Sequence, residues 1–134
     1  MDLSRLTVGL SGSVTLIVGD EHTAARVGSG QIAVLATPVM INLFEAAALE
    51  CAEALLPDGH QSLGTHLDVR HIAATPVGMR VTATAELVAV EGRELRFRLT
   101  AHDERELIGD GMHDRVVVNV ARFVARVGRK AAAT

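Results

Sequence analysis

Three side chains between residues 37 and 71 carry the groups that an acyl-transfer site requires. They are the hydroxyl of Thr37, the carboxylate of Glu45 and the imidazole of His71. In such a site a hydroxyl or a water attacks a carbonyl carbon, an imidazole removes the proton, and a carboxylate orients the imidazole. Each residue also has a structural interpretation, as a helix cap, a solvent-facing carboxylate and a core histidine. The three therefore form a candidate site if the fold brings them together.

The other reactive side chains have structural interpretations. His66 lies five residues before His71 on one expected strand, hence on the opposite face, so the two cannot share a metal ion. His102 and His113 each precede an aspartate near a strand end, and both are interpreted as solvated turn residues. Cys51 is interpreted as a small buried apolar residue. A lone cysteine excludes an internal disulfide and a zinc site built from cysteines, and we expect no metal.

The composition excludes several function classes. The chain has 134 residues, of which 49% are hydrophobic and 22% charged, as expected for one globular domain over residues 1–134. The 13 basic and 16 acidic residues give a net charge of −3, so no basic excess attracts nucleic acid. Trp and Tyr are absent, which removes the usual base-stacking platforms. No nucleophile elbow, P-loop or dinucleotide-binding glycine motif is present.

No segment of the sequence is typical of a membrane span or a signal peptide. The longest uncharged stretch, residues 27–44, is interrupted by glycines, a proline and polar side chains, whereas a spanning helix needs about 20 mostly apolar residues. No cleavage site of small residues follows the uncharged segment near the N-terminus. We therefore expect no membrane partner and a cytoplasmic location.

One long helix must position Thr37 and Glu45. Thr37 is suited to cap the free N–H groups of a helix, and Pro38 suits its first position. The helix is predicted over residues 38–56 and ends at Pro57-Asp58-Gly59. Its surface is apolar nearly all round, which is typical of a buried helix, so a sheet must curl around it.

The rest of the sequence supplies that sheet. Alternating apolar and polar residues predict strands at residues 13–18, 62–75, 80–90, 95–101 and 106–120, followed by a short helix at 122–130. Gly109 and Gly111 suggest a bulge in the last strand. A buried helix followed by an antiparallel meander indicates the α+β hotdog fold, with a cystatin-like cone as the rival. Because a single sheet of this kind leaves open edges, a homodimer is expected.

Several stretches of the sequence resemble the fluoroacetyl-CoA thioesterase family of hotdog proteins. The most specific are S-L-G-T at residues 62–65 and the motif H-I-A-A-T-P at residues 71–76. The eight-residue gap from Thr37 to Glu45 and the seven-residue gap from Gly64 to His71 also match. The resemblance covers roughly residues 33–130, with its matching stretches at 36–45, 59–65, 69–78, 81–87, 101–103 and 108–115.

The resemblance implies an acyl-CoA thioesterase in which Thr37, Glu45 and His71 are the catalytic set. It also implies that Gly64 shapes the pocket for the acyl thioester. Coenzyme A is then part of the substrate, and no cofactor is expected. The sequence leaves open whether Thr37 attacks the carbonyl or whether His71 and Glu45 activate a water.

Two further features bear on the substrate. Arg122 and Arg126, with Arg129 and Lys130, share one side of the C-terminal helix and are candidates for the phosphates of coenzyme A. The loop at residues 26–36 contains no aromatic residue, and Gln31 stands where the family has phenylalanine. Gln31 is therefore a candidate substrate contact, and short or medium acyl groups are expected rather than a selected fluoroacetyl group.

Two other functions are compatible with the same fold. The chain could bind acyl-CoA or another small ligand without turning it over, because a fold does not by itself define an activity. A hotdog dehydratase is a weaker alternative, since no histidine lies between residues 26 and 59 to supply its usual helical base.

Overall fold

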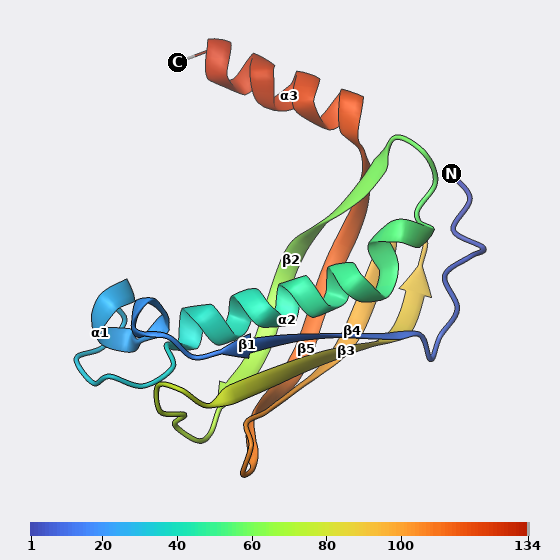
Figure 1. Cartoon of the computed structure of the whole chain (residues 1–134). Helices are drawn as coiled ribbons and strands as arrows, with labels where there is room; N and C mark the ends of the chain where they lie inside the picture. Colours follow the sequence, from blue (N-terminus) through green and yellow to red (C-terminus); the bar gives the residue numbers. More distant parts are fainter. Residues whose placement is uncertain (134) are drawn as a thin grey trace.

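Residues 1–133 are described by the computed structural model, in which one long helix lies across one antiparallel sheet (Figure 1). The strands are β1 (Ser11–Ile17), β2 (His60–His71), β3 (Arg80–Glu91), β4 (Glu94–His102) and β5 (Leu107–Asn119). The helices are α1 (Ala24–Val27), α2 (Thr37–Ala52) and α3 (Val120–Ala132), with 3-10 turns at Asp20–His22 and Glu53–Leu55. The elements follow the predicted order. The strand predicted over residues 62–75 ends earlier, at His71, and the predicted helix passes into a 3-10 turn after Ala52.

The sheet confirms the predicted hotdog fold. Its strand order is β1-β3-β4-β5-β2, and every neighbouring pair is antiparallel. The sheet curls around α2, which packs chiefly on β1 and β3 (Figure 1). β2 is therefore an edge strand, although it lies next to α2 in the sequence.

Small residues bring α2 close to the sheet. Ala83 and Ala85 of β3 are fully buried, as are Ala47 and Phe44 of α2. At Gly12 of β1, an added Cβ would lie 2.8 Å from the carbonyl oxygen of Ala47, so only glycine allows this approach. Small side chains at the contact let helix and sheet approach closely.

The prediction that α2 is buried nearly all round holds for one face only. Seven of its residues are buried, but Asn42, Leu49 and Glu50 are exposed in a single protomer, and Ile41 and Ala46 are only half-buried. The curl of one sheet covers one face of the helix. An apolar strip of α2 is consequently available to another surface.

The bulge predicted near Gly109 and Gly111 is present beside Gly109. Ala101 pairs with Gly109 but His102 pairs with Leu107, so Ile108 is the extra residue in β5. Other register shifts lie between Gly64 and His66 and between Leu87 and Ala89, whereas Gly111 keeps a regular register. The two glycines also allow close approach. An added Cβ at Gly109 would lie 2.5 Å from Sδ of Met40, and one at Gly111 would lie 2.6 Å from Cα of Val69.

Two features at one side of the molecule are only partly covered within the described residues 1–133. The middle of β2 is exposed along its free edge, including Leu63 at 41% and Leu67 at 36%. α3 follows β5 and projects away from the sheet and from α2 (Figure 1). No helix among residues 1–133 is long and apolar enough to cross a membrane.

Candidate active site

A hydroxyl–imidazole pair lies where α2 begins and β2 ends. Oγ1 of Thr37 and Nδ1 of His71 are 2.7 Å apart, although the residues are separated by most of α2 and all of β2. The pair lines an open cavity of about 300 Å³. The other lining residues come from α1, the loop before α2 and the segment after β2: Ala24, Ser29, Val34, Leu35, Ile72, Ala73 and Ala74. The structure thus brings together two of the three side chains of the predicted site.

The surroundings of His71 keep its imidazole neutral near pH 7. Burial lowers the pKa of His71 below its ordinary value of 6.5, and a contact with the backbone of Ala73 acts in the opposite direction. A neutral ring can accept a proton at Nδ1, where the Thr37 hydroxyl lies. The other ring nitrogen, Nε2, is buried without a hydrogen-bond partner in the protomer, the one such side-chain atom among residues 1–133. The imidazole is therefore placed to act as a base toward Thr37.

The expectation that Thr37 caps α2 is wrong. Ala36 is the N-cap residue, no side chain caps the helix, and Thr37 is the first helical residue. The N–H groups of Val39 and Met40 both donate to the carbonyl oxygen of Ala36, and Pro38 has no N–H. The hydroxyl of Thr37 is thus committed to His71 and not to the helix backbone.

Replacing Thr37 with valine tests whether its hydroxyl stabilises the protein through His71 or through the end of α2. We expect a cost of about 1 kcal/mol in the free energy of unfolding, because His71 loses its hydrogen-bond partner. If that is the cause, the cost disappears when valine is introduced into a His71→Ala background, and a double-mutant cycle of urea denaturation measures it. A cost that persists in that background would restore the cap interpretation. Thr37→Ser should retain part of the activity, since the hydroxyl remains.

Glu45 does not join Thr37 and His71 within one protomer. It lies eight residues after Thr37 on α2, a helical rise of about 12 Å. Its carboxylate faces Gly64 instead, where an added Cβ would be 2.8 Å from Oε2 of Glu45. Gly64 is seven residues from His71, about 23 Å along an extended strand. The predicted catalytic set is therefore divided between the two ends of β2.

A buried polar network holds Glu45 at its end of β2. Arg115 of β5 is 4% exposed, and its NH1 lies 3.4 Å from Oε2 of Glu45. Its Nε donates to Oγ of Ser62 at 2.8 Å, and NH2 donates to the Ser62 carbonyl oxygen at 2.9 Å. Ser62 in turn donates to Glu53 from its hydroxyl at 2.7 Å and its N–H at 2.9 Å. Residues on three elements thus fix the guanidinium beside Glu45.

The sequence interpretation of His113 as a turn residue is wrong. It lies within β5, is fully buried, and contacts the carbonyl oxygen of His66 at 2.9 Å and NH1 of Arg115 at 3.1 Å. Burial lowers its pKa, and the charge of Arg115 adds to that effect. His113 therefore packs neutral beside Arg115. His102, by contrast, is exposed at the end of β4, as expected.

The remaining predicted substrate contacts lie away from the cavity of their own protomer. Gln31 is exposed in the loop before α2 and does not line the cavity. Arg122 and Arg126 are exposed on α3, which projects away from the sheet (Figure 1). Neither arginine is among the residues that line the cavity.

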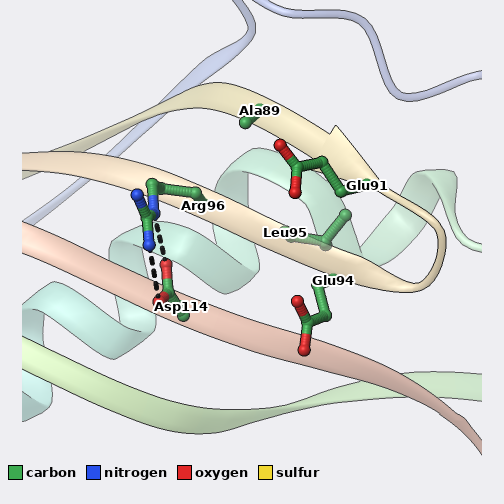
Figure 2. A pocket seen from close by; sticks show the side chains of 6 residues that line it. All are labelled: Ala89, Glu91, Glu94, Leu95, Arg96 and Asp114. Carbon is green, nitrogen blue, oxygen red and sulfur yellow. Dashed lines mark hydrogen bonds and ion pairs between the residues drawn. The ribbon is translucent and has the colours of Figure 1, made fainter.

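A second hollow lies at the hairpin between β3 and β4 and is separate from the Thr37–His71 pair. Figure 2 shows Arg96 bound to Asp114, with the carboxylates of Glu91 and Glu94 lining the same hollow near Leu95. The Arg96 guanidinium donates to both oxygens of Asp114, at 2.8 and 3.2 Å, and holds the pKa of that carboxyl below its usual range. The hollow therefore contains three carboxylates and one cation that is already paired, without a hydroxyl or an imidazole among its lining residues.

Comparison with known proteins relates this geometry to thioester hydrolysis. The family described as "FlK: Fluoroacetyl-CoA-specific thioesterase" matches residues 18–121. A fluoroacetyl-CoA thioesterase from Streptantibioticus cattleyicolor is 46% identical over 97 residues, which are 72% of this chain and 70% of that protein.

Solved structures show the same similarity. The fluoroacetyl-CoA thioesterase FlK is 39% identical, with a TM-score of 0.86 over 93% of this chain and 97% of the other. A Thermus thermophilus protein described as a thioesterase superfamily member is 27% identical, with a TM-score of 0.87 over 96% and 97% of the two chains.

Proposed function

The chain belongs to the fluoroacetyl-CoA-specific thioesterase family and is an acyl-CoA thioesterase, and on this premise we propose its catalytic residues, assembly and substrates. The observation that carries the proposal is the 2.7 Å contact between the Thr37 hydroxyl and Nδ1 of His71 inside an open cavity. Thr37, His71 and Glu45 are the catalytic residues. Hydrolysis consumes only water and the thioester, so no cofactor takes part, and we place the enzyme with the acyl-CoA pool of the cytoplasm.

The pair supports a base-assisted acyl transfer. His71 Nδ1 removes the proton of the Thr37 hydroxyl as Oγ1 bonds to the thioester carbonyl carbon, and the same proton passes to the departing CoA thiolate. A water then releases the acid from Thr37 with His71 again as base. If water attacks directly, His71 removes the proton of that water and the acid forms in one step. Mass spectrometry of acid-quenched enzyme separates the two routes, because only the first leaves an acyl group on Thr37.

A symmetric dimer formed through β2 would reunite the divided site. β2 is an edge strand with an exposed middle, and two copies can pair in antiparallel fashion along it. With the two-fold axis at Leu67 and Asp68, midway between Gly64 and His71, the two ends of β2 are brought side by side. Gly64 and Glu45 of one protomer then lie beside Thr37 and His71 of its partner. The half-exposed carboxylate of Glu45, 39% exposed in one protomer, becomes enclosed there.

The assembly can be measured directly. Light scattering at micromolar concentration should report about twice the mass of one chain, as expected for an isologous dimer. Substituting Leu67 with aspartate places two like charges at the proposed axis and should shift the mass toward one chain, with loss of turnover. The matched control is Val8→Asp, at an exposed apolar residue outside the sheet. A monomer that still hydrolyses thioesters at full rate would contradict the shared site.

The same dimer offers a phosphate contact. Arg122 and Arg126 extend from α3, which begins beside the start of β2. In the antiparallel pair this end lies opposite the segment that follows the partner's His71. We therefore assign the two arginines to the phosphates of the coenzyme A bound at the partner's site, with Gln31 at the edge of the acyl end.

The part of the cavity that would hold the acyl group favours small acyl groups and does not select fluoroacetyl over acetyl. Its lining is aliphatic, and the loop before α2 has no aromatic residue to close over the substrate. A single small substituent such as fluorine is worth only about 1–3 kcal/mol in a pocket. We expect fluoroacetyl-CoA and acetyl-CoA to differ in kcat/KM by less than about 10³-fold once their rates of base hydrolysis are factored out. A larger residual ratio would show that an aliphatic loop can select fluorine.

The decisive experiment is thiol release from a panel of acyl-CoA thioesters of increasing chain length. Steady release that is fastest with short or medium chains supports the proposal. Binding without steady release, or one stoichiometric burst, would indicate an acyl-CoA binding protein instead.

A further inference from the structure

α3 carries an apolar stripe that the described protomer covers only in part. Val120, Phe123, Val124 and Val127 follow the spacing of one helical face, and Arg126 lies one turn from Phe123 at the border of that face. Phe123 is 37% exposed, Val124 61% and Val127 51%. A helix of this length is marginal in water without tertiary packing, so its apolar face requires a partner surface. Figure 1 shows α3 extending away from both α2 and the sheet.

A second uncovered apolar surface surrounds the mouth of the Thr37–His71 cavity. Ile72 lines the cavity and is 50% exposed, and Val77 is 49% exposed. The loop before α2 adds Ile32, which is 71% exposed. The two segments form one surface, because the N–H of Leu35 donates to the carbonyl oxygen of Thr75 at 2.9 Å. The entrance to the cavity is therefore apolar and open in one protomer.

These two surfaces lie at opposite ends of the same strand. α3 begins where His60 pairs with Asn119, and the N–H of Val120 donates to the carbonyl oxygen of Gly59 at 2.9 Å. Ile72 follows directly after the last residue of β2. Antiparallel pairing of two β2 edges places the start of one strand beside the end of the other. The stripe of one protomer thus comes next to the cavity mouth of its partner.

We propose that α3 of each protomer packs its apolar stripe against the partner's segment after β2 and forms the outer wall of the partner's thioester cavity, with Phe123 at its mouth. The inference rests on the dimer of the proposed function. Phe44 and Phe97 are fully buried, so Phe123 is the one aromatic side chain of this sequence available at a surface. The wall shields the entrance on the coenzyme A side and does not reach the acyl group.

Pairing of the two α3 helices with each other is disfavoured by distance. With the axis at Leu67 and Asp68, the two starts of β2 are about 50 Å apart along the strands. Each α3 is only about 20 Å long. Two such helices do not meet even when they point toward each other. The partner's cavity mouth is the surface within reach.

Cross-linking tests the placement without using activity. Phe123→Cys and Ile72→Cys chains are co-expressed with different tags and treated with a short bis-maleimide. We expect a covalent dimer from the mixture and none from Phe123→Cys alone, while the native Cys51 is buried and remains silent. The control pairs Phe123→Cys with Val8→Cys. A covalent dimer from Phe123→Cys alone, or none from the mixture while light scattering reports a dimer, overturns the proposal.

Kinetics then test the function of the wall. Phe123→Ala should lower kcat/KM about tenfold for acetyl-CoA and fluoroacetyl-CoA alike. The substitution removes the aromatic side chain that covers the entrance and so exposes apolar surface there. The ratio between the two substrates should remain unchanged, and Val8→Ala should leave both values at the wild-type level. An unchanged kcat/KM for Phe123→Ala refutes the wall. Absence of thiol release by the wild-type protein would refute the proposed function instead, and the cross-link would still report the position of α3.

Discussion

His71→Ala should lower kcat for acyl-CoA hydrolysis by about 10²–10⁴-fold, the usual contribution of a general base. Nδ1 of His71 lies 2.7 Å from the Thr37 hydroxyl, and no other histidine lines the cavity. The matched control is His102→Ala, which removes an exposed imidazole at the end of β4 and should leave kcat unchanged. Near-normal turnover by a folded His71→Ala protein would remove His71 from the mechanism.

The pH profile gives the same assignment a second test. The base must be neutral, so kcat/KM falls as the pH drops through the pKa of His71. Because burial lowers that pKa, the midpoint of the fall should lie below pH 6.5, the ordinary value for histidine. His71→Ala should have no such acid limb in its residual activity. An acid limb that survives the substitution would assign the titration to a different group.

The fold could be predicted from the sequence because its local signals agree with one another. Pro38 and Pro57-Asp58-Gly59 delimit an apolar helix, and strict alternation marks β3 and β4. The sequence predicts an end of β2 four residues too late. Residues 72–75 are as apolar as a strand, but they lie outside the ladder of paired strands. The hydrophobic pattern of one strand does not show where the neighbouring strand stops pairing with it.

The site was predictable in part. The types of Thr37 and His71 indicate a candidate pair, although spacing alone cannot show that they meet, and the structure brings them into contact. The spacing of Glu45 was misleading. Two helical turns keep a residue near the same face of a helix but move it about 12 Å along the axis. No pattern within one chain indicates the second protomer that we propose to span this distance.

The buried network around Arg115 escaped the sequence analysis for another reason. His113 and Arg115 alternate with polar residues on β5 and look solvated, yet both point inward. There His113 bonds to the carbonyl oxygen of His66, and Arg115 bonds to Ser62 and Glu45. A charged residue on the inner face of a strand is visible only once the register is known. Gly64 was the available signal, because a glycine within a strand often marks a close approach.

Complementation between two inactive chains should show that Glu45 acts across the dimer. Glu45→Gln removes the carboxylate charge and His71→Ala removes the base, so each homodimer should lose most of its turnover. In a mixed dimer, the Glu45→Gln chain supplies Thr37 and His71 while the His71→Ala chain supplies Glu45, which makes one complete site. Random pairing makes half of the dimers mixed, each with one of two sites intact, so the mixture should recover about one quarter of wild-type activity.

The control mixture combines His71→Ala with the double substitution Glu45→Gln/His71→Ala, which leaves no complete site in any dimer and should recover nothing. If Glu45 served His71 of its own chain, the first mixture would also recover nothing, because each protomer would lack one member of its set. Recovery in the first mixture alone therefore requires the carboxylate to cross the interface. The geometry favours that outcome, because Gly64, which faces Glu45, is about 23 Å of strand from His71 in one chain and meets it only when a second β2 runs the other way.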